Sequence, residues 1–225
     1  MPPKPAKNPR EQLREGPTGH RVILGDSRDM PEIPTESVHL VVTSPPYANL
    51  KQYEQGNPSQ LGDIDDYEKF LDELDKVWAE CARVLVPGGR ICSVVGDVNV
   101  ARSNGGRHYV LPLAADIRVR ARRLGLDHLQ GITWYKVANI RLEASKSTRY
   151  LGKPNLPGGV IKNDTEHIVF LRKPGYRSPS GAMEKESFIR TDDYVRWFRS
   201  IWDDIPGARR SRLTRRRSRS RSPAG

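Results

Sequence analysis

The run Val41–Tyr47, VVTSPPY, constrains the fold of this chain more than any other stretch. Apolar residues from Val38 to Val42 predict a buried strand. Two consecutive prolines then end that strand, because proline has no N–H to donate to a neighbouring strand. The result is a rigid turn at the carboxyl end of a strand, which is where open α/β sheets place their ligands.

Helical and strand patterns alternate along the rest of the chain. Apolar residues at three- and four-residue spacing predict a helix over 67–86, capped by Asp65 or Asp66 and ended by Pro87–Gly89. A second helix is expected over 111–124, before Gly125. This alternation predicts an α/β fold with a doubly wound, mostly parallel sheet. Strands are expected at residues 21–24, 38–42, 90–95, 129–137 and 166–171.

The 225 residues suit one folded domain with two tails. Residues 1–20 are rich in proline and charge and are expected to be disordered, and the Arg/Ser-rich residues 207–225 cannot bury a core. The net charge of +11 comes from these ends, since residues 21–206 are nearly neutral. Basic tails suit a polyanion such as nucleic acid, although solvated ends without a partner explain the same composition.

The composition also limits the compartment and the chemistry. No apolar run approaches ~20 residues, and the N-terminus lacks the hydrophobic segment of a secretory signal. Cys81 and Cys92 lie in apolar segments without metal-ligand spacing. These features predict a cytoplasmic protein with reduced thiols, no membrane segment and no metal, with a disulfide as the alternative.

The residue types of the turn suit methyl transfer to an exocyclic amine of a nucleobase. Such an amine is a poor nucleophile, and acceptors at its two N–H groups localise its lone pair in the transition state. Ser44 Oγ and the carbonyl of Pro45 are the candidate acceptors, on a backbone that Pro46 keeps extended. Tyr47 offers a face on which a flipped base can stack. The alternative is a Pro-Pro strand terminator with an incidental tyrosine, because four residues are a weak pattern.

The TSPPY turn resembles the (D/N/S)-P-P-(Y/F/W) catalytic motif of DNA amino-methyltransferases. Its serine is most similar to the cytosine-N4 branch, although some adenine-N6 enzymes also carry serine. RVILGDS before VHLVVTSPPY resembles the branch whose catalytic motif lies near the N-terminus, and the resemblance covers about residues 21–206. It implies a Rossmann-like domain that uses S-adenosylmethionine, acts on double-stranded DNA, and serves a restriction–modification system or works as an orphan. YEKFLDELDKVWAECARVLVPGGRICSVVGDV, ITWYK and EHIVFLRKPG resemble later segments of the same family.

The resemblance assigns further roles to single residues. Asp26 matches an acidic residue that contacts the adenosyl part of the cofactor, and Thr43 and Asp97 are assigned to the same side of the site. A helix cap or a turn is the alternative role for the two aspartates. DNA contacts are expected from the loop after the turn and from the loop 138–163, although both could be solvated loops. The residues expected to make these contacts are Asn49, Lys51, Lys146, Arg149 and Lys153.

One block of the family pattern is not found in this sequence. The D-P-F-x-G-x-G-T type loop, which approaches the cofactor closely, has no counterpart, and an Arg/Ser run stands in its place from Gly207. We therefore expect the sheet to lack its first two cofactor-binding strands, through a truncated or frame-shifted gene. A second polypeptide that supplies the block is a separate alternative. A non-catalytic nucleic-acid-binding fragment and an RNA or protein amine methyltransferase also stay open.

Overall fold

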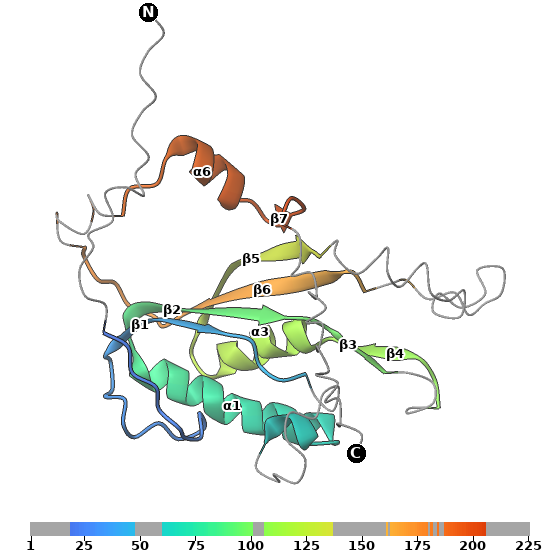
Figure 1. Cartoon of the computed structure of the whole chain (residues 1–225). Helices are drawn as coiled ribbons and strands as arrows, with labels where there is room; N and C mark the ends of the chain where they lie inside the picture. Colours follow the sequence, from blue (N-terminus) through green and yellow to red (C-terminus); the bar gives the residue numbers. More distant parts are fainter. Residues whose placement is uncertain are drawn as a thin grey trace, which may run out of the picture.

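The computed structural model describes residues 19–47, 60–100, 106–136, 161, 163–179, 181, 184 and 187–205. Its main sheet has five strands in the order β1-β2-β6-β5-β7 (Figure 1). Four of them run in the same direction, because β1–β2 and β5–β7 pair in parallel and β6 pairs antiparallel with both of its neighbours. The strands are β1 (Val38–Thr43), β2 (Leu85–Val95), β5 (Asp127–Tyr135), β6 (Thr165–Arg172) and β7 (Ile201–Trp202).

Two helices, α1 (Tyr67–Val84) and α3 (Leu113–Arg123), cover one face of this sheet (Figure 1). A short 3-10 helix, η2 (Leu61–Asp63), precedes α1. The carboxylate of Asp66 caps α1 by accepting a hydrogen bond from the Lys69 N–H at 3.1 Å. The helix α6 (Thr191–Trp197) lies on the opposite side of the sheet, so the fold class predicted from the sequence is confirmed.

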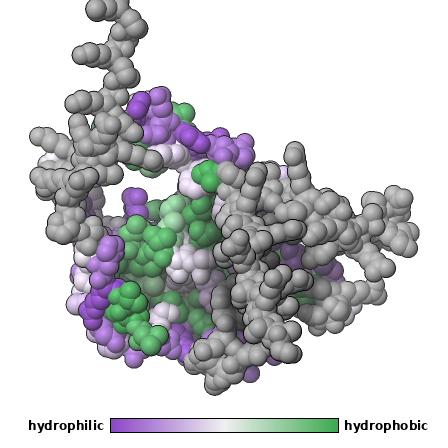
Figure 2. All heavy atoms as spheres, in the orientation of Figure 1, coloured by the Kyte–Doolittle hydropathy of each residue, from purple (hydrophilic) through white to green (hydrophobic). Residues whose placement is uncertain are grey.

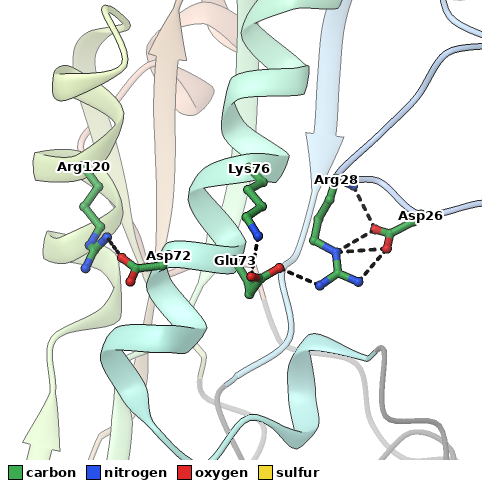
Figure 3. Close-up of polar contacts among 6 residues, drawn as sticks. All are labelled: Asp26, Arg28, Asp72, Glu73, Lys76 and Arg120. Carbon is green, nitrogen blue, oxygen red and sulfur yellow. Dashed lines mark hydrogen bonds and ion pairs between the residues drawn. The ribbon is translucent and has the colours of Figure 1, made fainter.

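The core lies between the sheet and the pair α1 and α3. Alternate residues of β2 point to the helices, so Ile91 and Val95 are fully buried. Arg120 of α3 adds a polar link between the two helices through ion pairs to α1, one of them to Asp72 at 2.8 Å (Figure 3). The buried residues contributed by the two helices are Phe70, Leu71, Leu74, Trp78, Cys81, Val84, Leu113, Ala114, Ile117 and Ala121.

The prediction of a strand over residues 21–24 is wrong. These residues form no regular structure, Val22 is 97% exposed and Leu24 is fully exposed. An extended segment becomes a strand only when a neighbouring backbone takes its hydrogen bonds, and no described strand pairs with it. The apolar pattern is present in the sequence, but a partner strand for it is not among the described residues.

The end of α1 predicted from the sequence is also wrong. The helix stops at Val84, and Pro87–Gly89 lies inside β2 rather than in a terminating turn. Gly88 has a φ of 77°, which favours glycine, and its N–H donates to the carbonyl of Lys173 at 3.0 Å. This segment therefore does not terminate a helix, because its backbone is hydrogen-bonded to Lys173, the residue that follows β6. Two further features were not predicted, the antiparallel hairpin of β3 (Val98–Val100) with β4 (Tyr109–Leu111), and α6.

The segment 26–37 is clamped along α1 before the chain enters β1. Arg28 bridges the Asp26 carboxylate at 2.6 Å and Glu73 of α1 at 2.7 Å, and Lys76 reaches Glu73 at 2.5 Å (Figure 3). Further along α1, Glu80 accepts a hydrogen bond from the backbone N–H of Met30 at 2.9 Å. These contacts hold the segment that leads into β1 against α1.

The strand β1 pairs with β2 on one side, and no described strand pairs with its other edge. Two of its apolar side chains face solvent, with Leu40 56% exposed and Val42 68% exposed. Figure 2 shows apolar surface gathered on one visible face of the molecule. Among the described helices, none is both long and apolar enough to cross a membrane.

Removal of a core side chain from α1 should destabilise the domain strongly. Leu74 is 1% exposed beneath the sheet, and we expect Leu74→Ala to lower the free energy of unfolding by about 2–5 kcal/mol. Val119→Ala on α3 is the control, because this side chain is 44% exposed and its removal should cost less than ~0.5 kcal/mol. Urea denaturation measures both, and equal losses would contradict the packing described for α1.

The clamp should make stability depend on acid pH. Hydrogen bonds first from Arg83 and then from the Met30 N–H lower the pKa of Glu80 from 4.5 to about 2. Because the pKa of Glu80 is lower in the folded state than in the unfolded state, ionised Glu80 stabilises the fold above pH 4.5. This stabilisation is lost as the pH falls towards 2. Glu80→Gln should therefore be less stable at pH 7 and lose less stability over the acid range. Denaturation across this range measures the slope, with the exposed Glu32→Gln on the same segment as the control.

Candidate active site

The TSPPY turn follows β1 at the carboxyl end of the parallel strands, as its sequence predicts. Thr43 is the last residue of β1 and lies opposite Ser93 of β2. After it, Ser44 is exposed, Pro45 is buried, and Tyr47 is half-buried against the core. The turn therefore presents a hydroxyl to solvent from a backbone that is packed into the protein.

Tyr47 connects the turn to the end of the next strand. Its ring lies beside Gly96, where a Cβ atom would stand 3.6 Å from Cε1 of the tyrosine. Hydrogen bonds link the Tyr47 side chain to the Ser44 side chain and to the Gly96 backbone. Burial, followed by the nearby charge of Glu166, raises the pKa of Tyr47, so its hydroxyl stays neutral. Because Ser44 can donate to Tyr47, both lone pairs on Ser44 Oγ can serve as acceptors.

An ion pair that the sequence did not reveal borders this tyrosine. Lys136, just after β5, binds Glu166 of β6 with Nζ and Oε1 2.6 Å apart. The ammonium also lies 5.0 Å from the centroid of the Trp134 ring. Glu166 reaches the same glycine as Tyr47, since its Cγ is 3.6 Å from the position of a Cβ at Gly96. Thirty positions separate the two charged residues, so only the antiparallel pairing of β5 with β6 brings them together.

Asp97 follows β2 and has a structural role. Its Oδ1 accepts a hydrogen bond from the backbone N–H of Ala114 at 3.1 Å, which caps the first turn of α3. Its carbonyl accepts from Nδ2 of Asn163 at 3.0 Å, and His167 Nε2 lies 3.9 Å from its Oδ2. The capping contact occupies one carboxylate oxygen, and the cofactor role assigned to Asp97 stays a prediction.

The carboxylate of Asp26 is hydrogen-bonded to the side chain of Arg28. Both of its carboxylate oxygens accept hydrogen bonds from the Arg28 side chain, which lowers the pKa of Asp26. An adenosyl hydroxyl would have to share or replace these bonds. Among the three residues assigned to S-adenosylmethionine, Thr43 and Asp97 lie at the ends of adjacent strands, and Asp26 lies on the clamped segment. The cofactor roles of Asp26 and Thr43 therefore also stay predictions.

The residues expected to contact DNA cannot be placed. Asn49, Lys51, Lys146, Arg149 and Lys153 lie outside the described residues, as do most of the two basic tails. A hollow of about 400 Å³ is found instead between the α6–β7 segment and the sheet face opposite α1 and α3. Its lining includes Phe170, Trp197 and Trp202 and none of the residues of the turn. This hollow is therefore separate from the candidate active site.

The sheet and the turn at its carboxyl edge define the class of this protein as a Rossmann-like methyltransferase. A family model described as DNA methylase, of the N6 and N4 type, matches residues 38–219. The chain belongs to this DNA methylase family. The predicted family is thereby confirmed, and so is S-adenosylmethionine as the cofactor of the family.

Two curated relatives are type II methyltransferases from archaea. M.MjaI from Methanocaldococcus jannaschii is 31% identical over 212 residues, which cover 84% of this chain and 67% of that protein. M.MthZI from Methanothermobacter thermautotrophicus is 30% identical over 223 residues, covering 92% of this chain and 60% of that protein. These matches support a place in restriction–modification systems for the family.

Two solved structures resemble the chain. TTHA0409 from Thermus thermophilus, solved with S-adenosyl-L-methionine, is 48% identical with a TM-score of 0.65, covering 84% of this chain and 68% of that one. The cytosine-N4-specific PvuII DNA methyltransferase is 17% identical with a TM-score of 0.50, covering 69% of this chain and 49% of that one, and supports the fold alone. The chain thus spans about two thirds or less of each of these four proteins.

The capping role of Asp97 can be tested by substitution. Asp97→Ala removes the acceptor for the Ala114 N–H and should lower the free energy of unfolding by about 0.5–2 kcal/mol. Asp97→Asn keeps a side-chain oxygen for the cap and should restore most of this stability. Thermal denaturation of the two variants and the parent gives the comparison. Equal destabilisation by both substitutions would show that the negative charge, rather than the cap, is what stabilises this end of α3.

Proposed function

We propose that this chain carries the target-base half of a DNA amino-methyltransferase and that its target is the N4 amine of cytosine. The observation that carries this proposal is the placement of Ser44. Its hydroxyl is exposed at the carboxyl end of β1 and hydrogen-bonded to the half-buried Tyr47. An acceptor and an aromatic face at one rigid turn are what a flipped base with an exocyclic amine requires.

The turn would act by orienting the amine and localising its lone pair. Ser44 Oγ and the Pro45 carbonyl accept the two N–H groups of the amine, and these hydrogen bonds strengthen as the nitrogen becomes tetrahedral. The bound cofactor supplies an electrophilic methyl group. The amine nitrogen bonds to the methyl carbon as the carbon–sulfur bond breaks and sulfur keeps the electron pair. One amine proton then leaves to solvent. Tyr47 and buried Pro45 hold the acceptor positions throughout.

The remaining assignments extend this proposal over the chain. Asp26, Thr43 and Asp97 would bind the cofactor, and residues 21–206 would form the catalytic domain. Double-stranded DNA in the cytoplasm would be the substrate, held in part by the residues expected to contact it after the turn and in the loop 138–163. The basic tails 1–20 and 207–225 would add charge attraction to the phosphate backbone.

Cytosine N4 is favoured over adenine N6 by the serine of the turn, which resembles the N4 branch. Methylation of adenine N6 is the first alternative. The second is a fragment that binds nucleic acid without catalysis. It is favoured by the described sheet, whose β1 edge has no partner among the described residues.

Expression in a host without its own DNA methylation tests the proposal. Mass analysis of nucleosides should detect N4-methylcytosine, and Ser44→Ala should reduce its yield by about 10²–10³-fold, because one transition-state acceptor is lost. Ser187→Ala is the matched control, since Ser187 is exposed and lies far along the chain from the turn. N6-methyladenine in place of N4-methylcytosine would contradict the proposed base. The absence of both products with the parent chain would favour the non-catalytic alternative.

A further inference from the structure

The antiparallel hairpin of β3 with β4 stands apart from the main sheet. Its pairing runs from Val98 with Leu111 to Val100 with Tyr109. Figure 1 shows the hairpin extending beyond the arrowhead end of β2, at the edge of the sheet that carries the TSPPY turn. A two-stranded hairpin by itself is only marginally stable in water, so it needs support at its base. That support comes from Val98, which is buried, and from Leu111, which packs against the core.

The base of the hairpin lies where two parts of the candidate site meet. Gly96, two residues before β3, lies beside the ring of Tyr47. The carbonyl of Asp97 accepts a hydrogen bond from Nδ2 of Asn163 at 3.0 Å, and Asn163 is the last residue of the loop 138–163 that is expected to contact DNA. A duplex whose flipped base enters the turn lies across this edge of the sheet, so it meets the element that projects from the edge.

The exposed part of the hairpin carries positive charge without an acidic counterpart. Residues 98–111 contain no aspartate or glutamate. Arg107 is exposed, and its guanidinium lies 5.6 Å from the centroid of the Tyr109 ring. Within the described part of the chain, Arg107 has no carboxylate partner. Contact with the ring restricts the arginine before any partner binds, which lowers the entropy that it loses on binding an anion such as a phosphate.

The other face of the hairpin presents groups that suit base edges. Asn99 lies opposite Val110, and both side chains are exposed. Because neighbouring residues of a strand point to opposite faces, these two side chains point away from the face that Val98 and Leu111 turn towards the core. The amide of an asparagine can both donate to and accept from one base edge, and an aliphatic side chain suits the methyl group of thymine. The major groove of B-DNA is wide enough to admit a two-stranded ribbon.

We propose that the β3–β4 hairpin is a DNA-contacting element that lies in the major groove beside the flipped base. Arg107 binds a phosphate of the duplex, and the face formed by Asn99 and Val110 reads base edges. The inference deepens the proposed function and rests on it for the position of the duplex. DNA suits this surface better than a protein partner does, because the surface combines unpaired positive charge with polar groups and little apolar area.

Cross-linking locates the contact without any methylation and without knowledge of the recognition sequence. Val110→Cys and the control Val119→Cys place a thiol at valines of nearly equal exposure, 46% on the hairpin and 44% on α3. Each full-length variant is labelled with a benzophenone maleimide and irradiated with end-labelled DNA duplexes of random sequence. We expect far more DNA adduct from Val110→Cys than from Val119→Cys. The labelled parent chain, which contains Cys81 and Cys92, gives the background.

Two outcomes of this experiment would overturn the proposal. One is an equal yield of adduct from the two variants, since the duplex would then approach the hairpin no more closely than it approaches α3. The other is a preference of labelled Val110→Cys for single-stranded RNA of random sequence over the duplexes, since the partner would then not be double-stranded DNA.

The phosphate contact of Arg107 is tested separately by its salt dependence. The affinity of the full chain for the same duplexes is measured by fluorescence anisotropy over a range of salt concentrations. Arg107→Ala should reduce the slope of log K against log salt by about 0.9, because one phosphate contact is lost. Arg123→Ala, at an exposed arginine of α3, is the control and should leave the slope unchanged. The basic tails are present in every variant, so the comparison isolates the substituted residue. An unchanged slope for Arg107→Ala, or an equal fall for both variants, would contradict the role of Arg107.

The hairpin proposal and the proposed function fail in different ways. Preferential DNA adducts from Val110→Cys, together with the absence of N4-methylcytosine from cells that express the parent chain, would retain the hairpin contact and contradict the function. N4-methylcytosine from the parent chain, together with equal adducts from the two cysteine variants, would contradict the hairpin contact and leave the function standing.

Discussion

The parallel pairing of β1 with β2 is the interaction on which the rest of the structure depends. It places Thr43 opposite Ser93 and so brings the turn after β1 next to Gly96 at the end of β2. The same pairing holds β2 beneath α1 and α3, where Ile91 is fully buried. The candidate active site is therefore supported by the most deeply packed part of the domain, and this explains how an exposed serine can have a fixed position.

Polar contacts around this pair serve both stability and the candidate site. Asp97 caps α3 and follows the strand that borders Tyr47, and Glu166 binds Lys136 while burial, followed by the charge of Glu166, raises the pKa of the tyrosine. Because these groups are partly buried, loss of one partner leaves the other without its hydrogen bonds. Substitutions at this edge will therefore change the fold and the chemistry together unless an isosteric variant is used.

The two sides of β1 have different chemical character. On the face towards the helices Val41 packs against the core, while on the opposite face Leu40 and Val42 are exposed. M.MthZI and TTHA0409 are longer than this chain, and S-adenosylmethionine is the cofactor of the family.

The sequence by itself determined the strand β1, the capped helix α1, the doubly wound class and the turn that carries Ser44 and Tyr47, because each depends on local periodicity or on proline. It could not determine the fate of residues 21–24, since a strand exists only with a partner. It also could not reveal the contact of Lys136 with Glu166 or the capping of α3 by Asp97. Those contacts join residues distant in sequence, and only the tertiary pairing of strands decides which of them meet.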